Sequence, residues 1–151
     1  MPGNAETSSM PPRVRLVFPA EPLAVRAAVS SLFDGMPTET LSEDDRGTAE
    51  IVIAEVLNNI VEHAYAGAPG KIDLTLEPTD SGLNCAIVDQ GTAMPQGDVP
   101  VGILPTGEGL DLPEGGFGWY MIRTLSEDIS YSRYPGGNCL TFHLPKRQSG
   151  I

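Results

Sequence analysis

Apolar and polar positions in the first third of the chain change from a strand-like to a helix-like pattern. Residues 13–19 (RVRLVFP) alternate, as a half-buried strand does, and Pro19 ends the alternation. Apolar residues at helical spacing follow from 21 to 33, with Pro22 in the first turn and Gly35 beyond the end. The pattern predicts a strand followed by a helix that covers a sheet.

The longest helix is predicted from Ser42 to Tyr65. Ser42 and Asp45 have the spacing of a capping box, and glycine and proline at 67–70 end the pattern. At about 100° per residue, one side of this helix is apolar. Its members are Ile53, Leu57, Ile60 and Ala64.

The second half of the chain predicts strands at 71–78, 83–89, 128–134 and 139–145, and a short helix at 117–125. The segment 83–89 is almost continuously apolar, so we expect a central strand there. The order strand, helix, helix, two strands, loop, helix, two strands predicts an α+β fold. We expect a two-layer sandwich with helices on one face of a mixed or antiparallel sheet.

Length and composition indicate one domain. We expect a single domain over 13–147, after a disordered tail at 1–12 that is rich in Pro, Ser and Gly. A net charge of −11 disfavours nucleic acid and anionic membranes as partners, and no signal or membrane segment is apparent, so a cytoplasmic protein is expected. Cys85 and Cys139 lack metal-site spacing and are interpreted as small core residues.

A polar stripe lies opposite the apolar side of the long helix and carries Glu55, Asn58, Asn59 and Glu62. Such a stripe is commonly only a solvated face. However, Glu55 and Asn59 at i and i+4 cannot form a salt bridge, and adjacent asparagines disfavour a helix. Carboxylate and amide oxygens are suitable ligands for Mg²⁺, so a Mg·nucleotide site becomes plausible.

Two glycine-containing turns could complete such a site. Asp89 ends the central strand and precedes Gly91, where a carboxylate could accept from an exocyclic amine beside a close backbone approach; a plain Asx turn is the alternative. Glycines at 115–118 precede the short helix, so backbone N–H groups could face phosphate. Neither a Rossmann fingerprint nor a P-loop is present.

Together these three segments resemble the ATP-binding boxes of the histidine-kinase-like (Bergerat) ATPases, which include gyrase, sensor histidine kinases and the anti-sigma-factor serine kinases. The resemblance covers residues 13–146, and the short chain without a phosphoacceptor hairpin is similar to the anti-sigma branch. It implies a serine/threonine protein kinase of transcription regulation that binds ATP and magnesium. It also implies sequestration of a sigma factor and phosphorylation of a serine on an anti-anti-sigma partner. Homodimerisation is implied as well, and we expect it through the first strand and helix.

By the same resemblance, Asn59 would bind magnesium and Glu55 would be the catalytic base. Asp89 would recognise the adenine amine. The remaining expected nucleotide-binding residues are Asn58, Gly91, Ala93, Gly115, Gly116, Phe117 and Gly118. Residues 96–114 would form a lid over the phosphates.

Two departures from the family pattern favour an alternative function. Ala93 stands where a second glycine is expected, and we expect its Cβ to restrict the turn. No Lys or Arg occurs between Lys71 and Arg123, so the lid offers no cation to the γ-phosphate. The alternative is a regulator with the ATPase fold that binds proteins without kinase activity.

Overall fold

The computed structural model describes residues 13–37, 40–94 and 116–147. Its strands are β1 (Val14–Pro19), β2 (Lys71–Thr79), β3 (Gly82–Asp89), β4 (Glu127–Tyr134) and β5 (Gly137–Pro145). Its helices are α1 (Pro22–Ser30), α2 (Glu43–Asn59), the π-helix η1 (Ile60–Tyr65) and α3 (Gly116–Leu125). The predictions of a disordered tail at 1–12 and a lid at 96–114 lie outside the described residues.

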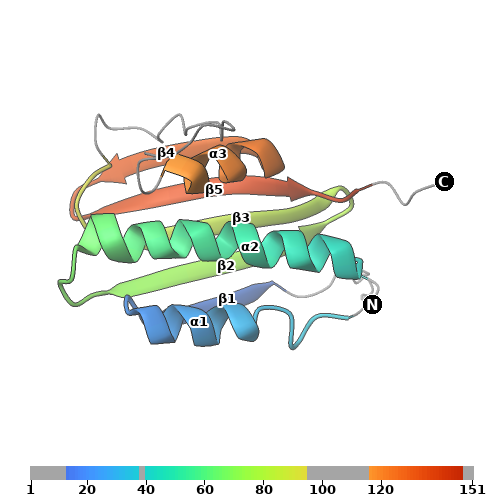
Figure 1. The fold of residues 1–151 in the computed structure, drawn as a ribbon, viewed down its shortest axis with the longest axis horizontal. Helices are drawn as coiled ribbons and strands as arrows, with labels where there is room; N and C mark the ends of the chain where they lie inside the picture. The colour runs from blue at the N-terminus through green and yellow to red at the C-terminus, as the bar shows by residue number, and fades with distance from the viewer. Residues whose placement is uncertain (1–12, 38–39, 95–115, 148–151) are drawn as a thin grey trace, which may run out of the picture.

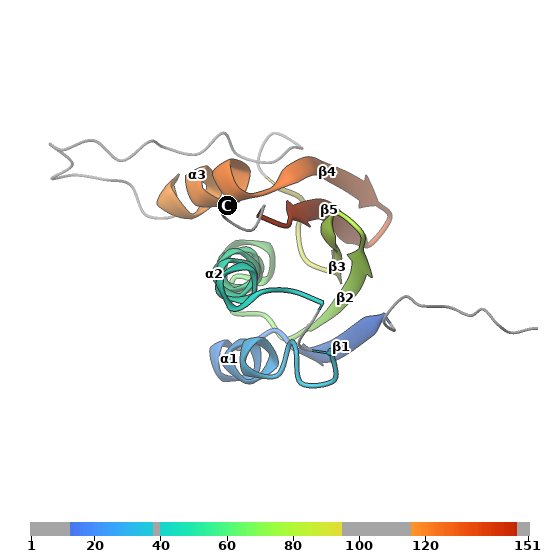
Figure 2. The ribbon, with the colours of Figure 1, turned by 90° about the vertical axis from the view of Figure 1, so that its right-hand side faces the viewer.

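The five strands form one sheet in the order β1-β2-β3-β5-β4, and each neighbouring pair is antiparallel. The helices lie on one side of this sheet, and α2 runs along its middle (Figures 1 and 2). The expected α+β two-layer sandwich is therefore confirmed, with an antiparallel sheet. The central place of β3 is confirmed as well.

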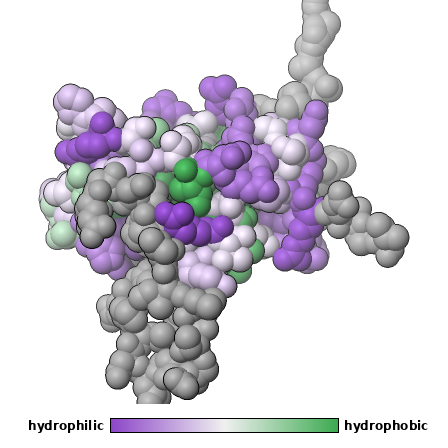
Figure 3. Space-filling view, turned by 90° about the horizontal axis from the view of Figure 1, so that it is seen from above, coloured by the Kyte–Doolittle hydropathy of each residue, from purple (hydrophilic) through white to green (hydrophobic). Residues whose placement is uncertain are grey.

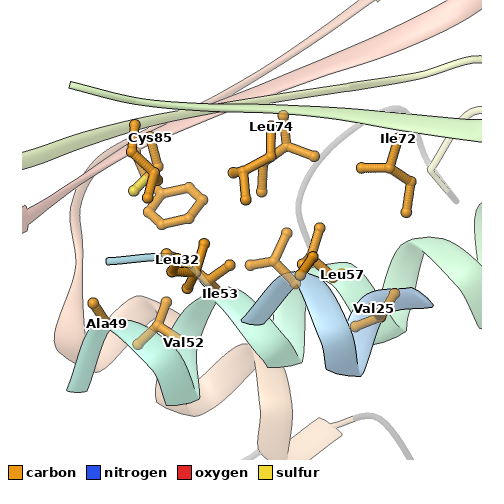
Figure 4. Packing of buried hydrophobic residues seen from close by; sticks show 14 of the residues in the cluster. Val25, Leu32, Ala49, Val52, Ile53, Leu57, Ile72, Leu74 and Cys85 are labelled. Carbon is orange, nitrogen blue, oxygen red and sulfur yellow. The ribbon is translucent and has the colours of Figure 1, made fainter. Parts of the chain in front are cut away.

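The hydrophobic core lies between the helical layer and the sheet. Side chains of α1 and α2, such as Val25, Ile53 and Leu57, face Leu74 and Cys85 on the strands (Figure 4). Along β2 and β3 the buried residues alternate with more exposed ones, as expected for strands covered on one face only. This packing places two residues of the polar stripe, Glu55 and Asn59, beside α3, whereas Asn58 and Glu62 stay exposed.

Ser42 caps the first turn of α2 as predicted, but Asp45 has a different partner from the one its spacing suggested. The Ser42 hydroxyl accepts a hydrogen bond from the Asp45 amide at 3.0 Å. The Asp45 carboxylate does not return to Ser42, as in a capping box, and instead accepts from the Arg147 amide at 3.3 Å. The start of α2 is thereby tied to the chain that leaves β5.

The single α-helix predicted up to Tyr65 is wrong beyond Asn59, where the chain continues as the π-helix η1. Ala66 then ends it in the left-handed conformation, with φ of 49°. Short π segments within helices occur frequently at functional sites. Here the wider turn carries the backbone of Ala64 toward the residues that follow β3.

Two smaller predictions also need correction. The first helix ends at Ser30 and not at Phe33, and the turn beyond it still buries Leu32 and Phe33 in the core. Cys85 is buried, and burial raises the pKa of its thiol, but Cys139 is only half-buried and is not a core residue. Cys139 follows the inward-facing Asn138 and therefore points to the open face of the sheet.

Candidate nucleotide-binding site

Glu55 and Asn59 lie one turn apart on α2 and are both half-buried against α3. The Asn59 side-chain NH₂ donates to the Glu55 backbone carbonyl at 2.8 Å. This hydrogen bond orients the amide, because its nitrogen faces the helix backbone and its oxygen is left to face outward. The two side chains thus present a carboxylate and an amide oxygen on one face of the helix.

Gly118 contacts this pair from α3. A Cβ on Gly118 would clash with Glu55 Oε1 and would lie 3.5 Å from Asn59 Nδ2. The sequence assigned Gly118 to close approach of the nucleotide, whereas here its missing side chain makes room for the Glu55 carboxylate. Glycine at this position therefore determines where the carboxylate lies.

Asp89 ends β3 and is buried, with only 3% of its surface exposed. Its Oδ1 accepts from the Gly91 amide at 2.8 Å and from the Asn138 side chain at 2.8 Å. The first bond closes the Asx turn that the sequence allowed. The second bond comes from β5, where Asn138 lies directly opposite Asp89 in the register.

The turn after Asp89 is packed against η1. A Cβ on Gly91 would lie 2.5 Å from the Ala64 carbonyl oxygen, and the Thr92 amide donates to that oxygen at 2.8 Å. Glycine is needed here because the backbone of η1 lies so close, whereas the close approach to a nucleotide stays a prediction. Ala93 is exposed and does not have positive φ, so the expectation that its Cβ restricts the turn is wrong.

Sequence analysis missed three residues around Asp89, namely Asn138, Tyr131 and Arg133. Asn138 is buried, accepts from the Tyr131 hydroxyl at 2.5 Å, and donates to the Thr92 carbonyl at 3.0 Å. Arg133 donates to the Gly91 carbonyl at 2.7 Å. Asn138 directly precedes the last predicted strand at 139–145, and only its pairing with Asp89 across the sheet identifies it.

The other predicted nucleotide-binding residues are not brought together by the described contacts. Asn58 is exposed on α2. Gly116 and Phe117 begin α3, although the Phe117 side chain is not described, and Gly115 lies outside the described residues. The resulting candidate site has one group of residues on α2 and α3 and a second at the end of β3.

Glu55 and Asn59 on α2 fit a magnesium site only if a bound nucleotide supplies further ligands. Within residues 13–37, 40–94 and 116–147, no three His, Cys, Asp or Glu side chains gather as a metal site. Mg²⁺, however, commonly takes one or two protein oxygens and completes its shell with water and phosphate oxygens. The outward amide oxygen of Asn59 and the nearby Glu55 carboxylate match that chemistry.

The sequence matches the model of the histidine kinase-like ATPase domain family over residues 18–144. Serine-protein kinase RsbW of Bacillus thuringiensis (strain Al Hakam) is 33% identical over 108 residues, which cover 70% of this chain and 68% of the relative. The RsbW proteins of Bacillus cereus and Bacillus anthracis match to the same extent. This chain belongs to the anti-sigma serine kinase family.

Solved structures share the fold of this anti-sigma kinase family member. A Mycobacterium tuberculosis protein with RsbU and RsbW domains superposes with a TM-score of 0.60 at 19% identity, over 93% of this chain and 34% of the other. A blue-light-activated histidine kinase from Erythrobacter litoralis gives 0.53 at 19% identity, over 80% and 39%. The chain thus spans about a third of these longer proteins.

Family membership implies a kinase-like ATPase domain that binds ATP. No helix among the described residues has the length and apolar character needed to cross a membrane.

Proposed function

We propose that this protein binds Mg·ATP, sequesters a sigma factor and phosphorylates a serine on an anti-anti-sigma protein. The observation that supports this best is the arrangement of Glu55 and Asn59 against Gly118, at the start of α3. It joins a carboxylate, an oxygen ligand and a helix N-terminus, which favours anions. The similarity to serine-protein kinase RsbW supports the choice of substrate class.

In this proposal Asn59 contributes its amide oxygen to magnesium, and Asp89 accepts a hydrogen bond from the adenine amine. When bound, Mg·ATP would supply the γ-phosphoryl group with ADP as the leaving group, and the magnesium ion would offset the negative charge of the phosphates. Glu55 accepts the proton from the serine hydroxyl of the partner, which makes the oxygen a better nucleophile. The α2–α3 contact holds the Glu55 carboxylate in place for this transfer.

Calorimetric titration of Mg·ATP tests the binding part of the proposal. We expect binding by the wild type and at least about tenfold weaker binding by Asn59→Ala and by Asp89→Asn, a change of about 1.4 kcal/mol. Asn84→Ala is a matched control, because Asn84 lies on the opposite face of the sheet, where it contacts His143. Failure of the well-folded wild type to bind nucleotide would overturn the ATP site.

Transfer of labelled γ-phosphate to a candidate anti-anti-sigma protein tests the catalytic part. Glu55→Ala should abolish transfer while ATP binding persists, whereas Glu50→Ala on the same helix should retain both. Co-purification with a sigma factor of the host tests sequestration separately. If the wild type binds ATP but transfers no phosphate, the alternative function is favoured, which is a regulator that binds proteins without kinase activity.

A further inference from the structure

A chain of hydrogen bonds joins the end of β3 to strand β4 through the buried side chain of Asn138. The Asn138 NH₂ donates to Asp89 Oδ1 at 2.8 Å, and its carbonyl oxygen accepts from the Tyr131 hydroxyl at 2.5 Å. The Tyr131 hydroxyl in turn accepts from the Met94 amide at 3.0 Å. Asp89 is thus connected through Asn138 on β5 and Tyr131 on β4 to the backbone that follows β3.

The neighbours of Asn138 determine the orientation of its amide. Its nitrogen faces only acceptors, which are the Asp89 carboxylate and the carbonyls of Gly91 and Thr92. Its oxygen faces donors, the Tyr131 hydroxyl and the Arg133 guanidinium at 3.2 Å. The flipped amide would place oxygen against a carboxylate and two carbonyls, so only one orientation satisfies these groups.

Asn138 has no remaining capacity to contact a ligand. Both of its N–H groups have acceptors, its oxygen accepts two hydrogen bonds, and only 4% of the residue is exposed. Its contribution to a site must therefore come through Asp89.

Asp89 keeps one oxygen for a ligand. Both of its hydrogen bonds end on Oδ1, and no described residue donates to Oδ2. None of the described side-chain oxygens is fully buried without a partner, so Oδ2 is not completely enclosed by the described residues, although only 3% of Asp89 is exposed. The carboxylate is held by one oxygen and offers the other as an acceptor.

We infer that Tyr131 and Asn138 are positioning residues that hold Asp89 to accept from an exocyclic amine, and so set a preference for adenine over guanine nucleotides. This inference rests on the ATP site proposed above. Adenine presents an amine at the position where guanine presents a carbonyl oxygen. A fixed carboxylate offers only acceptors, so it stabilises the amine and repels the carbonyl.

The test compares Tyr131→Phe and Asn138→Ala with the wild type in two measurements. Calorimetry gives the dissociation constants for Mg·ATP and Mg·GTP, and hydrogen exchange without nucleotide reports the amides of Gly91 and Met94. Tyr134→Phe is the matched control, since Tyr134 lies on the same strand and its hydroxyl makes no hydrogen bond with a described residue. Tyr131→Phe removes only one hydroxyl and is expected to fold, so the inference can still be tested if Asn138→Ala does not fold.

We expect Tyr131→Phe to lose protection at Met94, and Asn138→Ala at Gly91. Both should bind ATP about tenfold more weakly, with a smaller effect on GTP. The dissociation constant for GTP divided by that for ATP should therefore fall. A wild-type ratio in folded variants that bind ATP would overturn the inference alone. No nucleotide binding by the wild type would overturn the proposed site, and the base preference with it.

Discussion

Gly118 shows how a missing side chain can position a carboxylate. The space that a Cβ would fill is taken by the tip of Glu55, and the Asn59 amide lies next to it. A Gly→Ala change would also favour the α3 helix, so any cost should appear at the site before it appears in stability. A substitution at Gly118 therefore tests whether the place of the Glu55 carboxylate matters for activity, with little effect on the stability of the fold.

Gly118→Ala should reduce phosphoryl transfer about tenfold to a hundredfold, because displacement of a catalytic group by about 1 Å has that effect. Thermal stability should change little, since the end of a flexible side chain can move aside. Steady-state transfer rates and a melting curve provide the measurement. Gly47→Ala on α2 is the control, because its Cβ would meet no atom within 4 Å and would stabilise the helix by about 0.5–1 kcal/mol.

In contrast to Gly118→Ala, which should lower the transfer rate and leave stability almost unchanged, Gly91→Ala should destabilise the fold. Its Cβ would lie 2.5 Å from the Ala64 carbonyl oxygen and 2.6 Å from the carbonyl carbon, and these backbone atoms cannot rotate away. We expect a loss of about 1–3 kcal/mol in the free energy of unfolding, as for overpacked sites, measured by urea denaturation. An unchanged midpoint, equal to that of Gly35→Ala at an open position, would contradict the packing of η1 against this turn.

At the scale of elements, alternation was sufficient to predict a strand such as β2, because a sheet covered on one face buries every second residue, and a continuous apolar run was sufficient for the central strand β3. The i, i+4 spacing was likewise sufficient to place Glu55 beside Asn59. The end of the α-helix at Asn59 could not be predicted, because the contact made by η1, between Ala64 and Thr92, joins residues 28 apart in the sequence. Asn138 was missed for the same reason, since its partner Asp89 is 49 residues away.

The pairing of β1 with β2 predicts a pH dependence of stability. Arg15 donates two hydrogen bonds to Asp73, at 3.0 and 2.5 Å. These hydrogen bonds are the main cause that lowers the pKa of Asp73; partial burial opposes the shift, and the charge of Arg15 adds a smaller lowering. Because the folded-state pKa is below that of the unfolded chain, the stabilisation is complete above the ordinary pKa of Asp, about 3.9.

Asp73→Asn should therefore lower the melting temperature slightly at pH 7, where the wild type has the full benefit of the pair. The difference should shrink as the pH falls below about 4 and vanish below the lowered pKa of Asp73. The effect stays small because the Arg15 side chain is 65% exposed, and added salt should reduce it further. Melting curves of both proteins from pH 7 to acid provide the measurement, and a constant difference would contradict the assignment to this ion pair.

For the whole molecule, the excess of negative charge and the hydrophilic surface limit where a protein partner could bind. The coloured surface seen from the side of α3 and β4 is mainly hydrophilic, with a small hydrophobic group (Figure 3). Large exposed apolar side chains occur elsewhere among the described residues. Val17 on β1 is 52% exposed and Leu23 on α1 is 77% exposed.

Leu23 supports the homodimer that we propose through β1 and α1, whereas Val17 alternates with the buried Phe18 and so faces the open side of the sheet. An exposed apolar side chain is removed from water when an interface covers it. Leu23→Asp should convert a dimer into a monomer, since a symmetric interface would bury the new charge twice. Sedimentation equilibrium at several concentrations measures this, with circular dichroism to confirm that the fold is intact.

Ile51→Asp is the matched control, because Ile51 is 52% exposed on α2, outside the proposed interface, and this variant should remain a dimer. If the dimer is also needed for the ATP site, Leu23→Asp should weaken Mg·ATP binding, and if the site lies within one chain it should not. Glu55 and Asn59 lie on α2 and Asp89 on β3, outside the interface proposed through β1 and α1, so we expect unchanged ATP affinity in the monomer. A wild type that sediments as a monomer at every concentration would refute the interface without affecting the nucleotide site.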